Sequence, residues 1–215
     1  MPRALLYYIT DRTQFPGTET QRRQNLLDKI HEAASCAVDY IQLREKDLSS
    51  RDLEKLGRDA LDAIRSEQSP TRLLINSRSD IALAVGADGV HLRSHDISVA
   101  DAKEVAKLAF GHPEPETRNW LVAASCHSEE EVLRAASAGA DFVVFAPVFE
   151  KAGGSPTGLD PLHRACRYIV PVLALGGVTL ENAQSCLDAG AAGIAGIRLF
   201  QENDIANVVR RVTTA

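Results

Sequence analysis

The sequence predicts an α/β fold, a single (β/α)₈ TIM-barrel domain that spans residues 1–215. The first observation is an internal repeat, in which a motif resembling Ala-Gly-Ala precedes an apolar run. Counted at Asp39, Asp88, Asp141 and Ala192, the repeat has steps of 49, 53 and 51 residues. Each period has room for two strands and two helices, so the chain holds eight strand–helix units. The second observation is the length, since 215 residues is typical of one barrel domain.

Short apolar runs supply the strands that lie between the repeat motifs. We expect these strands at Leu5–Ile9, Leu73–Asn76, Leu121–Ala124 and Val172–Leu175. Between the strands, apolar residues recur at three-to-four spacing, which is typical of a helix with one buried face. Examples are Leu53, Leu56, Ala60 and Ile64, and later Val132, Ala135 and Ala136. Strands that alternate with helices indicate a parallel sheet. A closed barrel is expected, with an open doubly wound sheet as the alternative.

The third observation is the stretch from Pro171 to Phe200, which has the order and size of one βαβ unit. Its first strand ends in Gly176 and Gly177, and we expect Thr179 to cap a helix over Leu180–Asp188. A second apolar run, Gly193–Ile197, follows. Barrels commonly hold phosphate with the loops after their seventh and eighth strands, so a phosphate site is predicted here.

Composition excludes several classes of function. The formal charge of -5 argues against a nucleic-acid-binding surface, and no apolar window reaches the length of a membrane span. The opening residues, MPRALLYYITDR, contain too short an apolar run for a signal peptide. The four cysteines form no C-x-x-C pair, so we expect reduced, mostly buried thiols and a cytoplasmic protein.

The chemistry is expected at the carboxyl ends of the strands. After the second strand, Gln42, Arg44 and Lys46 alternate and should point to one side, while the residues between them point away. Two cations in register at a strand end favour a site for a multiply charged anion. The alternative is a salt-bridge cluster with Glu45 and Asp47 at the rim of the barrel.

Further candidates follow the third and fourth strands. The amide of Asn76 could bind a phosphate oxygen or a pyrimidine edge. Asp96 is a candidate ligand for Mg²⁺, which prefers oxygen donors and often shares them with substrate phosphates. Alternatively, Asp96 is the N-cap of a helix that starts near Ser98.

After the fifth strand, Ser125 and His127 are predicted to reach the barrel mouth. Ser128 and Glu131 have the spacing of a capping box and should open the next helix. A histidine at a barrel strand end is a candidate general acid or base, with a structural role as the alternative.

Two segments interrupt the alternation of strands and helices. Residues 110–119 are a polar connector, expected on the side away from the site. Residues 147–158 form a Gly- and Pro-containing loop on the side of the Gly-rich turns, of a kind that often acts as a mobile lid.

Taken together, these motifs resemble the thiamine phosphate synthase/TenI family over nearly the whole chain. They are QLREK, the strand ending in Asn76, GADGVHL followed by Asp96, SCHS, APVF, LGGVT and the closing Gly-Ile-Arg. The resemblance implies a TIM barrel that joins hydroxymethylpyrimidine diphosphate to hydroxyethylthiazole phosphate and releases diphosphate. The expected partners are therefore small phosphorylated molecules, and the chain is compatible with a homo-oligomer.

The resemblance also implies roles for individual residues. Gln42, Arg44, Lys46 and Asn76 would hold the pyrimidine diphosphate, Asp96 would bind Mg²⁺, Ser125 would contact substrate, and backbone groups near Gly177 and Ile197 would hold the thiazole phosphate.

The chain departs from the synthase pattern at three places. Ser77 stands where a second magnesium-binding Asp is usual, and Lys151 is the only cation of a loop that usually carries Thr-x-Thr-Lys. Arg198 replaces the usual Ser after the last strand, which could strengthen phosphate binding or crowd it. The alternative function is that of the TenI branch, a thiazole tautomerase, and a non-catalytic or different phosphate-binding role is a third interpretation. The tautomerase needs the thiazole phosphate site and a His at the position of His127.

Overall fold

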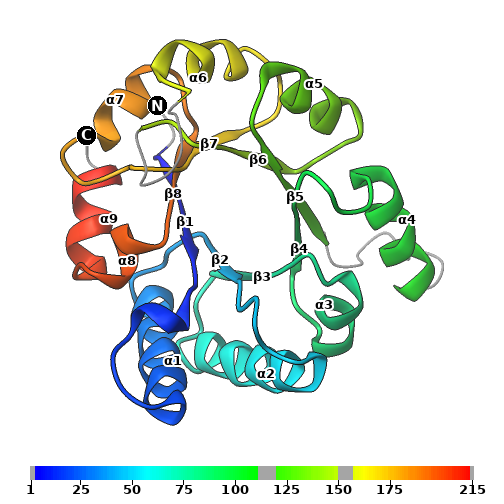
Figure 1. Ribbon diagram of the computed structural model, residues 1–215, viewed down its shortest axis with the longest axis vertical. Coiled ribbons are helices and arrows are strands. Elements are labelled where there is room, and N and C mark those ends of the chain that lie inside the picture. Colours follow the sequence, from blue (N-terminus) through cyan, green and yellow to red (C-terminus); the bar gives the residue numbers. More distant parts are fainter. Residues whose placement is uncertain (1–2, 111–119, 150–156, 214–215) are drawn as a thin grey trace.

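Eight parallel strands close into a barrel, numbered β1 to β8 in chain order, in a computed structural model that describes residues 3–110, 120–149 and 157–213 (Figure 1). The strands are β1 Leu5–Ile9, β2 Tyr40–Leu43, β3 Arg72–Asn76, β4 Gly89–Leu92, β5 Leu121–Cys126, β6 Phe142–Phe145, β7 Val172–Ala174 and β8 Gly193–Gly196. Because β8 also pairs with β1, the predicted barrel is confirmed and the open sheet is wrong.

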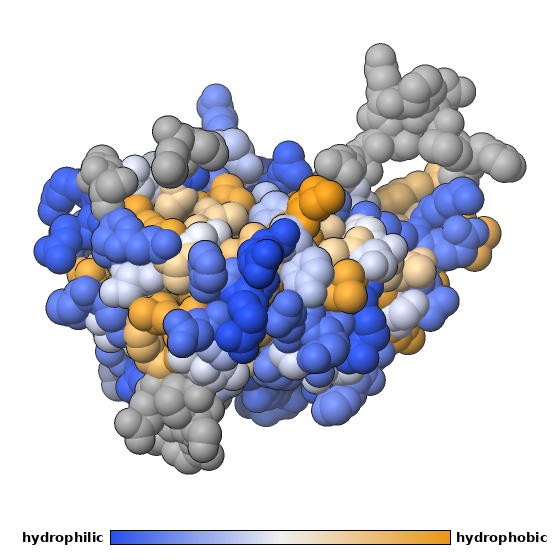
Figure 2. Space-filling view, turned by 90° about the horizontal axis from the view of Figure 1, so that it is seen from above, coloured by the Kyte–Doolittle hydropathy of each residue, from blue (hydrophilic) through white to orange (hydrophobic). Residues whose placement is uncertain are grey.

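Helices surround the barrel as an outer ring (Figure 1). They are η1 Arg12–Gln14, α1 Glu19–Ser35, α2 Ser50–Ser66, α3 Ser79–Val85, α4 Val99–Phe110, α5 Glu129–Ser137, α6 Leu159–Ala165, α7 Ala183–Asp188, α8 Arg198–Gln201 and α9 Ile205–Thr213. On the face drawn in Figure 2, hydrophilic residues are interspersed with smaller apolar patches. None of the helices within the described residues is both long enough and apolar enough to cross a bilayer.

The core has two layers, because successive side chains of a strand point to opposite faces. One set packs between the sheet and the helices, and the other fills the barrel. The interior set is Tyr7, Ile9, Leu74, Leu121, Ala123, Phe142, Val144, Leu173 and Ala195. Tyr7 contacts Phe142 edge to face at 5.2 Å between ring centroids, and Tyr40 stacks on Phe142 at 4.7 Å. The barrel is therefore closed below its mouth by packed side chains.

The repeat of about 50 residues has a structural cause at the amino ends of the strands. The carboxylate of Asp39 accepts the backbone N–H of Leu6 at 2.9 Å. In the same way Asp88 accepts that of Leu73 at 2.9 Å, and Asp141 that of Val122 at 2.8 Å. Each aspartate precedes an even-numbered strand and binds the odd-numbered strand before it, so it ties together the two strands of one repeat.

Two local predictions need correction. Helix α7 begins at Ala183, three residues later than expected. Thr179 instead organises a turn, in which its N–H donates to Asn182 Oδ1 at 2.8 Å and its Oγ1 accepts the N–H of Glu181 at 3.3 Å. Ser128 does cap α5, but the Glu131 carboxylate accepts the N–H of His127, at 2.6 Å, and not that of the cap residue.

All four cysteines are free thiols, as expected. Two of them, Cys126 and Cys186, are buried, and burial raises the pKa of each thiol to about 12. These two cysteines therefore act as small apolar core residues.

Candidate active site

Polar side chains continue the inward-facing rows of β2 to β5 where these strands reach the carboxyl rim of the barrel. They are Gln42, Asn76, His91 and Ser125, each two residues beyond the inward positions Tyr40, Leu74, Gly89 and Ala123. Asn76 and His91 are neighbours in the register of β3 and β4. The apolar filling of the barrel therefore gives way to a polar layer at one end.

Three of these side chains belong to a buried hydrogen-bonded chain. Gln42 Nε2 donates to the Tyr7 hydroxyl at 2.9 Å, and that oxygen lies 3.1 Å from His91 Nδ1. His91 Nε2 lies 2.8 Å from Ser125 Oγ. Gln42 and His91 are each only 2% exposed, whereas Ser125 is half-buried at the mouth. Gln42 thus extends the interior of the barrel, and Ser125 is the end of the chain that faces outward.

Arg44 is a half-buried cation just beyond the end of β2. Its backbone N–H donates to Thr10 Oγ1 at 2.9 Å. Burial lowers the pKa of its guanidinium, opposed by the charges of Asp11 and Glu45. After burial, the charge of Arg44 is also the main cause that lowers the pKa of His91, to about 3. The guanidinium therefore acts on the mouth side of the strand, where an anion would compensate its lost hydration.

Two clefts at the rim share the residue Arg93. The first, of about 210 Å³, is lined by Lys46, Asn76 and Ser77, among others. The second, of about 310 Å³, reaches Asp96 and Ser125. Arg93 is therefore an additional cation that lies in one cleft with Lys46 and Asn76 and in the other with Asp96 and Ser125, whereas Gln42 and Arg44 line neither cleft. Arg93 lies two residues beyond His91, and this alternation was the signal that could have identified it from the sequence.

Asp96 folds back onto the strand end and is not the helix cap. Its carboxylate accepts the N–H of Arg93 at 2.8 Å and Arg93 Nη2 at 3.0 Å. Burial opposes its ionisation, but hydrogen bonds from Arg93 and from the Ser77 hydroxyl outweigh burial and lower its pKa. Ser98 caps α4 by accepting the N–H of Asp101 at 3.1 Å, so the N-cap alternative for Asp96 is wrong.

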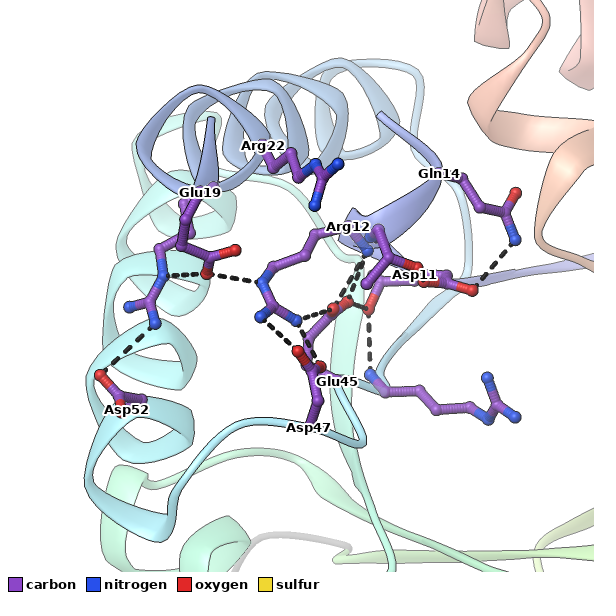
Figure 3. Close-up of polar contacts among 12 residues, drawn as sticks. Asp11, Arg12, Gln14, Glu19, Arg22, Glu45, Asp47 and Asp52 are labelled. Atoms are coloured by element: carbon purple, nitrogen blue, oxygen red, sulfur yellow. Dashed lines mark hydrogen bonds and ion pairs between the residues drawn. The ribbon is translucent and has the colours of Figure 1, made fainter. Parts of the chain in front are cut away.

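The acidic residues that alternate with Arg44 and Lys46 are bound by a third arginine (Figure 3). Arg12 Nη1 lies 3.1 Å from Glu45 Oε2 and 2.7 Å from Asp47 Oδ1. The side chains of Arg12 and Glu45 are 4% and 1% exposed, so this is a buried ion pair. Thr10 Oγ1 also donates to Glu45 Oε1, at 2.6 Å. The rim salt-bridge cluster considered from the sequence does exist, but its cation is Arg12, a residue that the motifs did not single out.

On the opposite side of the mouth, main-chain groups gather after β7 and β8. Gly176 and Gly177 have φ of 97° and 65°, and a Cβ on Gly176 would lie 2.7 Å from Pro147 Cα. The N–H of Phe149 donates to Gly176 O at 2.9 Å, which ties the loop after β6 to this turn. The short helix α8 begins directly after Ile197, at the end of β8, with Arg198 exposed in its first position. Loops after the last two strands and a short extra helix are the parts of a barrel phosphate site.

His127 is exposed at the rim after β5, and Nδ1 of its ring lies 2.7 Å from Ala146 O. This contact occupies one ring nitrogen and leaves Nε2 as the atom that could take part in proton transfer. Lys151 lies outside the described residues, as do residues 150–156 of the predicted lid and residues 111–119 of the polar connector.

Comparison with known proteins identifies the family of the chain. The family described as thiamine monophosphate synthase matches residues 6–200. The chain belongs to the thiamine monophosphate synthase family. A putative thiamine-phosphate synthase of Geobacter sulfurreducens is 41% identical over 197 residues, which cover 88% of this chain and 83% of that protein. The putative thiamine-phosphate synthase 2 of Aquifex aeolicus is 37% identical over 201 residues, covering 92% and 97%.

Solved structures give the same result. The thiamine phosphate pyrophosphorylase of Pyrococcus furiosus superimposes with a TM-score of 0.77 at 29% identity, over 97% of this chain and 93% of that one. A 3-hexulose-6-phosphate synthase superimposes with a TM-score of 0.67 at 18% identity, which shows only the shared fold. The chain therefore shares its sequence family and its barrel fold with the Pyrococcus protein.

Proposed function

We propose that the chain condenses hydroxymethylpyrimidine diphosphate with hydroxyethylthiazole phosphate to give thiamine phosphate and diphosphate. The proposal is supported by two groups of residues at one rim of the barrel, each suited in its chemistry to an anion. In the first group, Lys46 and Arg93 line one cleft, and Arg44 is near enough to Arg93 for the two charges to interact. The turns at Gly177 and Ile197 form the second group. The reaction needs one region for a diphosphate and another for a monophosphate.

The proposed reaction breaks the C–O bond between the pyrimidine methylene and the diphosphate. The bonding electron pair leaves with the diphosphate, and positive charge develops on the methylene, where the aminopyrimidine ring delocalises it. The thiazole nitrogen then supplies the electron pair of the new C–N bond. Arg44, Lys46 and Arg93 would stabilise the charge of the departing diphosphate, so catalysis rests on electrostatics and positioning without a protein nucleophile.

We propose that Asp96 would hold a Mg²⁺ ion that is shared with substrate, in exchange for part of its present bonding to Arg93. Within the part of the chain that the structure describes, no group of three or more His, Cys, Asp or Glu side chains could hold a metal by itself. Asp96 offers one carboxylate, and the Ser77 hydroxyl lies against it. Mg²⁺ is commonly held by one or two carboxylates together with substrate phosphates. When bound, the ion would supply further positive charge beside the diphosphate.

The synthase assay tests the proposal. Purified protein, both phosphorylated substrates and Mg²⁺ should yield thiamine phosphate and diphosphate in equal amounts. Absence of thiamine phosphate under these conditions would overturn it. We also propose a cytoplasmic location, because four free thiols fit a reducing compartment.

A second candidate, thiazole tautomerase activity, is favoured by the position of His127. Its Nδ1 is tied to Ala146 O, so its Nε2 could move a proton on a thiazole phosphate carboxylate. His127→Asn should abolish a tautomerase and only slow a synthase. A thiazole phosphate carboxylate that is isomerised by the parent protein and not by this variant would establish the second function.

A further inference from the structure

The buried chain Gln42–Tyr7–His91–Ser125 has a fixed direction. The Gln42 amide nitrogen only donates, so the Tyr7 oxygen accepts its bond. The single hydroxyl hydrogen of Tyr7 is then available for His91 Nδ1, 3.1 Å away. A neutral imidazole that accepts at Nδ1 carries its hydrogen on Nε2, which lies 2.8 Å from Ser125 Oγ.

The surroundings keep the side chains of this hydrogen-bonded network uncharged. Burial raises the pKa of Tyr7 well above its usual value. Burial and the charge of Arg44 lower the pKa of His91 to about 3, so the ring stays neutral at physiological pH. The hydrogen-bonded network of these four side chains therefore fixes the direction of each hydrogen bond and does not conduct protons.

We propose that Tyr7 and His91 are positioning residues that orient the Ser125 hydroxyl. In this arrangement Ser125 Oγ accepts from His91 Nε2, and its own hydrogen is directed into the barrel mouth. The Ser125 hydroxyl forms no other hydrogen bond within the described residues, and Ser125 lines the cleft that also contains Arg93 and Asp96. Because the same cleft contains the cation Arg93, Ser125 acts as a donor to a diphosphate oxygen. The identity of that ligand rests on the proposed function.

The first test measures the tautomer of His91 directly. In ¹⁵N-labelled protein, two-bond ¹H–¹⁵N correlations of the imidazole should show hydrogen on Nε2 and an unprotonated Nδ1, with the signal assigned by its loss in His91→Gln. Tyr7→Phe removes the donor to Nδ1, so the ¹⁵N signal of that nitrogen should move toward the position of an imidazole nitrogen without a hydrogen bond. Tyr40→Phe is the matched control. This tyrosine also packs inside the barrel, against Tyr7, but it is not a member of the hydrogen-bonded network. A parent ring protonated on Nδ1, or equal changes in both variants, would overturn the proposal.

The second test measures how the orientation of the Ser125 hydroxyl affects kcat and KM. Loss of one hydrogen bond is worth about tenfold, so Tyr7→Phe should lower kcat by about tenfold with a smaller change in KM, while Tyr40→Phe keeps the parent rate. In a Ser125→Ala background, Tyr7→Phe should change little more, since the hydroxyl that it orients is already gone. His91→Gln, whose amide can still donate to Ser125, should retain more activity than His91→Leu. Full additivity of the Tyr7 and Ser125 changes would contradict the proposal.

The orienting role of Tyr7 and His91 can be tested even if the proposed synthase activity is absent. If the parent protein makes no thiamine phosphate, inorganic diphosphate serves as the probe in place of substrate. Ser125→Ala and Tyr7→Phe should then weaken its binding by similar factors and Tyr40→Phe should not. That result would support the orienting role of Tyr7 and His91 even without synthase activity, and unchanged binding in all three variants would exclude it.

Discussion

Arg44 combines partial burial with a full positive charge, which makes it the residue whose replacement should weaken anion binding most directly. Arg44→Gln removes the charge and keeps most of the side-chain volume. We expect inorganic diphosphate to bind about 10- to 100-fold more weakly, because charge-assisted hydrogen bonds to an anion contribute about 1.5–3 kcal/mol each. Isothermal titration calorimetry measures the change.

The matched control for Arg44 is Arg65→Gln, an exposed arginine in the last turn of α2. It removes the same charge far from the mouth and should leave diphosphate affinity within a factor of two, a small effect typical of a screened surface charge. Equal losses in the two variants would mean that only net charge matters, and the anion site at β2 would have to be abandoned.

His91 should make the protein less stable as the pH falls below neutrality. Its pKa is lowered from 6.5 to about 3 by burial and by Arg44, so the folded state keeps the ring neutral while the unfolded chain protonates it. The unfolded state thus binds more protons between these values, and stability is lost as pH falls through 6.5. The expected loss from this group between pH 8 and pH 5 is about 2 kcal/mol. Urea unfolding at both values should show it, and His91→Gln should show less pH dependence; an equal slope in the variant would contradict this origin.

At the scale of elements, the sequence predicted most of the strands because each is a short apolar run bounded by turn residues. It missed the start of α7, because the turn held by Thr179 and Asn182 depends on side-chain hydrogen bonds that a capping pattern does not distinguish from a helix start. The Asp repeat could be found from spacing, but its cause could not. Asp39 binds Leu6, a residue 33 positions earlier, and only the closed sheet brings them together.

The segment after β2 depends on the ion pair between Arg12 and Glu45. Arg12→Gln would leave the Glu45 carboxylate buried without its cation, and we expect a loss of about 3–5 kcal/mol in the free energy of unfolding. Arg23→Gln is the control, because Arg23 also pairs with Glu19 but is more exposed, and it should cost less than about 1 kcal/mol. Chemical denaturation of both variants measures this difference. Equal costs would show that the pair does not stabilise the strand end.

At the scale of the whole molecule, the site could be predicted where residues alternate on a strand and not where distant segments meet. The alternation of Gln42, Arg44 and Lys46 predicted one side of the rim, but β2 ends at Leu43, and Lys46 lines a cleft together with Leu43 and Glu45, which were expected to point away from it. The alternation could not show that Gln42 turns inward to Tyr7, because that contact depends on how side chains fill the barrel. Arg12 could not be identified from the sequence for the same reason, since its partners Glu45 and Asp47 lie 33 and 35 positions later.

The two sides of the mouth should bind anions independently, since one uses side-chain cations of β2 to β4 and the other uses main-chain groups after β7 and β8. A ligand present at 100 times its Kd stabilises a folded protein by about 2.7 kcal/mol, and two ligands at separate sites should add their increments. Inorganic diphosphate and hydroxyethylthiazole phosphate, measured alone and together by denaturant unfolding, should give this sum.

Variants should separately remove the stabilisation that each of the two ligands gives to the folded protein. Arg44→Gln should reduce only the diphosphate increment. Gly176→Ala, which places a Cβ 2.7 Å from Pro147 Cα at a φ of 97°, should reduce only the thiazole phosphate increment. Gly139→Ala isolates the cost of a positive φ, because Gly139 has a φ of 83° and its Cβ would lie 3.9 Å from the nearest atom, Lys103 Nζ. If the second ligand adds nothing once the first is saturating, the two anions compete for one region, and the division of the rim that the condensation requires is absent.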